Sequence, residues 1–111
     1  MNARRLLGVR ARAERGAHFL DTQWPRWAEF LLFFHLIDMG HPDYSLLAEL
    51  YGGFEVALDA LGISYKEAQS FGFIPKTNVN NDLAWLIEAA YLDGFWLELV
   101  RERQATARAA A

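Results

Sequence analysis

The chain has 111 residues, of which 53% are hydrophobic, and this content is typical of one folded domain with a substantial core. It contains no cysteine, which excludes disulfides, thiolate metal sites and cysteine nucleophiles and fits a cytoplasmic protein. The formal net charge is −3, and residues 27 to 100 carry eleven acidic side chains against two lysines, so this central region disfavours binding to a phosphate backbone.

The first element is predicted as an amphipathic helix from Ala3 to Asp21, because apolar residues recur there at steps of three and four. Arginines interrupt the apolar run that a signal peptide requires, so we expect no secretory signal. The arginines also offer a possible nucleic-acid contact, and the alternative is that they face the acidic body or solvent. They are Arg4, Arg5, Arg10, Arg12 and Arg15.

A second helix is predicted from Pro25 to Asp38, since proline favours the first turn of a helix and Gly40 ends the pattern. Its stretch FLLFFHLIDM, residues 30 to 39, is apolar at eight of ten positions. That run is about half of the roughly 20 residues that a membrane-spanning helix needs. A helix that is apolar all round must be buried all round, either by its own domain or by another chain.

Three short helices are predicted next. The first begins at Pro42 and ends at Tyr51, and the second runs from Phe54 to Leu61 with Gly62 as a left-handed cap. The third begins at Ser64, which has capping-box spacing to Glu67, and ends before Gly72. A loop around Pro75 then leads to the last helix, expected from Asp82 to Arg103, with residues 104–111 as a frayed tail.

The last helix carries two apolar stripes, although one would suffice for packing onto a small core. Gly94 lies in its interior at a cost of about 1 kcal/mol relative to alanine, which predicts a kink or the close approach of another backbone. One stripe consists of Leu83, Ile87, Ala90 and Leu97, and the other of Trp85, Ala89, Leu92, Trp96 and Leu99.

Several segments resemble a family of small, largely uncharacterised proteins of actinobacteria and their phages. They are GAHFLDTQWPRWAEFL, LAELYGGFEVALDALG, AQSFGF and WLELVRER, and the resemblance covers about residues 16 to 103. These are packing motifs, so the resemblance implies a shared fold and no particular activity. The chain departs from the family pattern at residues 43–45, which lack a Cys-x-Cys-like element, and at Phe30, Leu32 and Phe34, where relatives tend to have polar residues.

The chain shows no catalytic or cofactor motif. Its serines lack a Gly-x-Ser-x-Gly context, and the YGGF segment lacks the remaining residues of a phosphate-binding loop. Four possible metal ligands lie within nine residues, but they also fit ordinary helix capping, and no second histidine pair supports them. They are His35, Asp38, His41 and Asp43. We therefore expect no enzyme activity, no metal and no cofactor.

The sequence thus predicts a single all-α domain of five to six helices over residues 1–111, with the terminal helices packed against each other. We interpret it as a non-enzymatic protein-binding module, phage-encoded and directed at a host protein. The alternatives are a self-associating homodimer and a small nucleic-acid-binding protein that uses the arginine-rich first helix. The predicted contact residues are Phe30, Leu32, Phe33, Phe34, Trp85, Tyr91 and Trp96.

Overall fold

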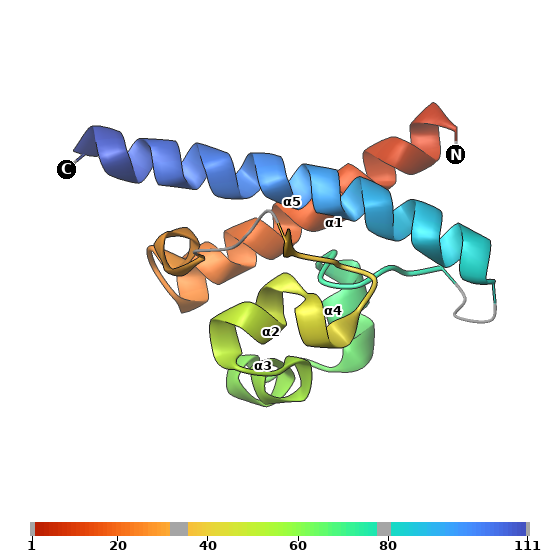
Figure 1. The fold of residues 1–111 in the computed structure, drawn as a ribbon, viewed down its shortest axis with the longest axis horizontal. Helices are drawn as coiled ribbons and strands as arrows, with labels where there is room; N and C mark the ends of the chain where they lie inside the picture. Colours follow the sequence, from red (N-terminus) through yellow and green to blue (C-terminus); the bar gives the residue numbers. More distant parts are fainter. Residues whose placement is uncertain (1, 32–35, 78–80, 111) are drawn as a thin grey trace.

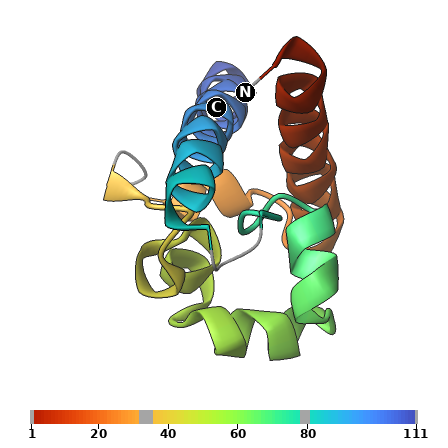
Figure 2. The same cartoon turned by 90° about the vertical axis from the view of Figure 1, so that its right-hand side faces the viewer.

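The computed structural model describes residues 2–31, 36–77 and 81–110. Within these ranges it contains five α-helices, the short 3-10 helices η1 and η3, and no strand, which confirms the predicted all-α fold. The elements are α1 (Ala3–Gln23), η1 (Trp27–Phe30), η3 (Pro42–Tyr44), α2 (Leu46–Tyr51), α3 (Phe54–Leu61), α4 (Tyr65–Ser70) and α5 (Asp82–Ala110). The two long helices, α1 and α5, pack against each other at an angle, and the short helices α2, α3 and α4 lie together on one side of that pair (Figures 1 and 2).

The short helices begin and end at the signals in the sequence. The Ser64 hydroxyl accepts a hydrogen bond from the Glu67 N–H, and the Glu67 carboxylate accepts one from the Ser64 N–H, so α4 has the predicted capping box. Gly62 ends α3 in the left-handed conformation, with φ of 68°. The single helix predicted from Pro42 to Tyr51 is instead divided into η3 and α2, because the Ser45 hydroxyl caps α2 by accepting from the Ala48 N–H.

The predicted helix from Pro25 to Asp38 is wrong. Arg26 adopts a left-handed backbone conformation, the following residues form only the short turn η1, and Leu31 is extended. The carbonyl oxygens of Ala28 and Leu31 accept hydrogen bonds from the Gln104 side chain, at 3.0 and 3.3 Å. Because α5 satisfies these carbonyls and buries Leu31, the segment does not need a continuing helical ladder.

The helix α5 continues to Ala110, past Arg103 where we expected it to end. Arg103 donates to the Asp21 carboxylate at 2.7 and 2.9 Å, which ties this half of the helix to the end of α1. Together with the Gln104 bonds, this contact holds the expected tail, residues 104–110, in helical form.

The core lies where α1 and α5 meet the Phe71–Gly72 turn. The Trp96 ring stacks on Phe73, with centroids 5.5 Å apart, and its Nε1 donates to the Gly72 carbonyl oxygen at 2.7 Å. A Cβ on Gly16 would lie 2.0 Å from the Phe71 carbonyl oxygen. A Cβ on Gly72, whose φ is +67°, would lie 2.7 Å from the Ala13 nitrogen. Glycine is therefore required on both sides of this backbone contact.

A buried ion pair joins the two long helices. The Arg12 guanidinium donates to the Glu88 carboxylate at 3.1 Å, and the two side chains are only 10% and 3% exposed. The same carboxylate accepts from the Lys76 N–H and from the Thr77 hydroxyl, while Arg12 Nε donates to the Gln69 carbonyl oxygen. Each buried charge is thus satisfied by several partners, as burial of a charge requires.

Replacing one member of this pair should be costly. We expect Arg12→Met to lower the free energy of unfolding by about 3 to 5 kcal/mol, because the Glu88 carboxylate would stay buried without its counter-charge. Arg10→Met is the matched control on the same helix, since the Arg10–Glu14 pair is half exposed and should contribute at most about 1 kcal/mol. Urea unfolding of both variants measures the difference, and equal losses would contradict this account.

Candidate protein-interaction surface

One face of α5 forms much of the core. Ala89, Leu92, Trp96 and Val100 recur at steps of three and four residues and are at most 4% exposed. This buried face includes Ala89, Leu92 and Trp96 of the second stripe seen in the sequence, and it packs against α1, η1 and the loop after α4. The helix therefore needs no further apolar residue to dock onto its own domain.

The opposite face of the first half of α5 is apolar and exposed. Leu83 is 69% exposed, Leu86 64%, Tyr91 41% and Ile87 38%. These residues follow the spacing of one helix face, so they form a continuous surface. We call this surface the α5 strip, and it consists of Leu83, Leu86, Ile87, Ala90, Tyr91 and Gly94.

No charged side chain interrupts the α5 strip. The two acids between Leu83 and Leu97 turn toward the protein interior and bind groups there. Glu88 pairs with Arg12, as described above. Asp93 accepts a hydrogen bond from the Met39 N–H at 2.7 Å. Burial raises the pKa of Asp93 to about 6; the Met39 hydrogen bond opposes this change, and the nearby Asp38 adds to it.

Gly94 lies in the α5 strip, and no contact within the described part of the chain requires a glycine at this position. A Cβ built on it meets no heavy atom within 4 Å, in contrast to Gly16 and Gly72. Of the two predicted explanations, the close approach of another backbone is therefore absent within the described residues, and α5 runs through this position as one continuous helix. The helix accepts a destabilising residue at the centre of an open surface.

The predicted contact residues on α5 divide between surface and core. Tyr91 belongs to the α5 strip and stacks on Phe95, with ring centroids 6.5 Å apart. The prediction that Trp96 lies at the surface is wrong. Its side chain is 1% exposed and packs between Trp27 and Phe73. Trp85 is half-buried and donates from Nε1 to the Gly40 carbonyl oxygen at 3.0 Å, so it mainly holds the turn at residues 38–41.

The predicted surface of the second helix is described only at its start. Phe30 is 59% exposed, and its ring contacts Trp24, with centroids 5.1 Å apart. Leu32, Phe33 and Phe34 lie outside the described residues, so their part in a contact surface stays a prediction. The predicted contact residues do not include Leu83, Leu86 and Ile87, which are exposed. The first apolar stripe of the last helix is the sequence signal for Leu83 and Ile87, whereas Leu86 belongs to neither stripe.

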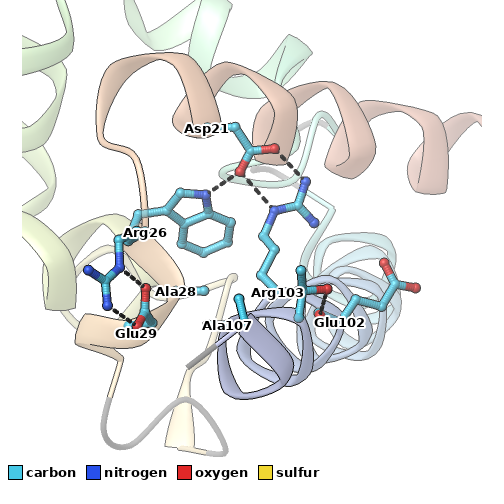
Figure 3. A pocket seen from close by; sticks show the side chains of 10 residues that line it. Asp21, Arg26, Ala28, Glu29, Glu102, Arg103 and Ala107 are labelled. Carbon is cyan, nitrogen blue, oxygen red and sulfur yellow. Dashed lines mark hydrogen bonds and ion pairs between the residues drawn. The ribbon is translucent and has the colours of Figure 1, made fainter.

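A groove of about 780 Å³ lies between η1 and the second half of α5, and its charged side chains are largely paired with one another (Figure 3). Asp21 accepts from Arg103 and from Trp27 Nε1, and Arg26 donates to Glu29 at 2.6 and 2.7 Å. The Arg103 hydrogen bond is the main cause that lowers the pKa of Asp21. We interpret this groove as a structural clamp for α5, since these charges already have partners.

The remaining candidates from the sequence form no further site in the described ranges. No group of three or more His, Asp or Glu side chains there could hold a metal ion. Asp38 accepts from the Gly40 N–H and His41 from the Asp43 N–H, while His35 lies outside those ranges. Three of the five N-terminal arginines have protein partners: Arg10 pairs with Glu14, Arg12 with Glu88, and Arg15 donates to the Ser70 carbonyl oxygen.

Comparisons with family models, with curated proteins and with solved structures gave no match to this chain. The resemblance to the actinobacterial and phage family therefore stays a prediction. No helix in the described part of the chain is long and apolar enough to cross a membrane.

The half-buried Asp93 should make stability depend on pH. A raised pKa means that the folded state holds the proton more tightly, so the stabilisation by this proton is complete below the ordinary pKa of 3.8 and is lost as pH rises through about 6. Asp93→Asn keeps an oxygen that can accept from the Met39 N–H but cannot ionise. We expect the variant to gain stability relative to the wild type between about pH 4.5 and about pH 7.5.

Urea unfolding at both pH values measures this difference. Comparing variant with wild type at each pH cancels the titration of the other groups. A difference in the free energy of unfolding that stays constant across this range would contradict the assignment.

Proposed function

We propose that this chain is a non-enzymatic protein-binding module and that the α5 strip is its contact surface. The observation that carries the proposal is the combination of large exposed apolar side chains and the inward direction of the only two acids in that part of the helix. The four large side chains expose on the order of 400 Å², which is within the size range of functional patches on monomers. Covering that area could contribute on the order of 10 kcal/mol before association costs.

The shape of the surface favours a helical or extended segment of another protein. The strip is a convex helix face with small residues, Ala90 and Gly94, next to larger ones. A partner helix with its own apolar face can approach closely over small residues and can contact the leucines on either side. The Tyr91 hydroxyl is the single polar side-chain group of the strip, so the strip lacks the several convergent polar groups that orient a small molecule.

The contacts of the arginines favour this function over nucleic-acid binding. Phosphate binding needs several lysine or arginine side chains free to face one backbone. Arg12 is almost fully buried against Glu88, and Arg10 and Arg15 are engaged by Glu14 and by the Ser70 carbonyl oxygen. The α5 strip itself carries no basic side chain.

Site-specific photo-crosslinking tests the proposal. The photoreactive residue p-benzoylphenylalanine is placed at Leu86 in cells that naturally contain the chain, and adducts are identified by mass spectrometry. The matched control is Leu7 on α1, which is 67% exposed against 64% for Leu86. We expect protein adducts from position 86 and few from position 7.

Each outcome has a clear meaning. Adducts with one defined protein, which can be a second copy of this chain, support a binding surface on α5. Equal labelling at the two positions, or no protein adduct at position 86, would contradict the proposed function.

A further inference from the structure

We infer that the partner of the α5 strip is a second copy of this chain, and that the two α5 helices pack antiparallel about Ala90. This inference rests on the proposed function and names its partner. A two-fold axis at Ala90 pairs residues whose numbers add to about 180, so that each copy presents the same surface to the other.

The α5 strip is self-complementary when it is read in opposite directions. Large side chains, Leu86 and Ile87, lie on one side of Ala90, and Gly94 lies on the other. Antiparallel pairing about Ala90 places Leu86 and Ile87 of one copy over Gly94 of the other. It also brings the two alanines face to face and places Leu83 opposite Leu97. Large residues thus meet small ones twice in the same contact.

This arrangement explains Gly94. The position beside it is open for at least 4 Å among the described residues, so nothing in the single chain requires glycine there. In the antiparallel pair, the absence of a side chain makes room for Leu86 and Ile87 of the second copy. Gly8 on α1 is equally open, but its neighbour Leu7 is isolated from any comparable exposed apolar stripe.

The distribution of charge also permits two copies to meet here. Each copy carries a net charge of −3, but neither Glu88 nor Asp93 faces the strip, so no acid is forced against another acid in the apolar contact. Beyond Leu97, the next residue along this face is Glu98, which antiparallel pairing about Ala90 places opposite Asp82 of the other copy. Acidic side chains therefore meet at the two exposed ends of the contact, outside its apolar centre, and weaken the dimer at low salt.

The area of the strip sets the expected strength. Two copies that each cover on the order of 400 Å² bury roughly 800 Å² plus a rim, which lies at the lower end for specific complexes. The dimer should therefore be weak, with a dissociation constant in the micromolar range. Higher salt should leave the affinity unchanged or raise it, because screening reduces the repulsion between two acidic molecules.

Sedimentation velocity between about 5 and 500 µM tests the dimer directly. We expect the wild-type chain to shift from monomer to dimer over this range. Leu86→Glu should weaken the dimer by about a hundredfold, because two carboxylates would enter the apolar contact. Leu7→Glu is the matched control at an equally exposed leucine and should dimerise like the wild type. Circular dichroism confirms that both variants keep their helices.

Cysteine crosslinking tests the axis, and the natural absence of cysteine makes each variant unambiguous. Ala90→Cys should form a disulfide-linked dimer under mild oxidation, whereas Ala60→Cys, an exposed alanine on α3, should not. A mixture of Leu83→Cys and Leu97→Cys chains should crosslink more than either chain alone, which distinguishes antiparallel from parallel packing.

These outcomes separate this inference from the proposed function. A chain that stays monomeric at the highest concentration, or dimers that survive Leu86→Glu, would overturn the inference. If the chain is monomeric and photo-crosslinking at position 86 still captures a different protein, the proposed function stands and the second copy does not.

Discussion

The close contact between the backbone of α1 and the Phe71–Gly72 turn determines where α5 can lie. Gly16 and Gly72 allow this contact because neither has a side chain in the way. Trp96 then fills the space beside it and donates to the Gly72 carbonyl oxygen, which fixes the rotation of α5 about its own axis. With Leu92 and Trp96 turned inward, the residues half a turn away must face outward. The exposed α5 strip is therefore a consequence of how the core is built.

The inward direction of Glu88 and Asp93 gives this exposed surface its chemical character. In most surface helices, charged residues occupy the side that faces water. Here the two acids in the middle of α5 accept hydrogen bonds from Arg12 and from the Met39 N–H instead. Burying them costs desolvation, which the raised pKa of Asp93 reflects. The outer face is consequently left to leucine, isoleucine, alanine and tyrosine.

The sequence predicted those elements whose signals are local. The capping box at Ser64, the glycine at residue 62 and the periodicity of α1 depend on neighbouring residues only, and they agree with the structure. The segment after Pro25 could not be predicted in this way, because partners outside it satisfy its polar groups: Asp21 on the preceding helix and Gln104, which is far away along the chain.

The candidate surface also depends on contacts between distant residues, which the sequence pattern does not reveal. The double stripe was visible in the sequence, but a pattern of apolar residues does not say which stripe is buried. The contacts of Trp96 with Phe73 and Gly72 decide that question, and they are formed by residues more than twenty positions away along the chain.

The proposed dimer buries the outer face of α5 against the same face of a second molecule. Isotope-filtered nuclear Overhauser spectroscopy on a mixture of labelled and unlabelled chain, at a concentration where the dimer is populated, tests this contact most directly. We predict intermolecular cross-peaks between the Ile87 methyl groups and the Gly94 α-protons. Intermolecular cross-peaks that arise only from other residues, such as Leu7 or Phe30, would contradict the claim.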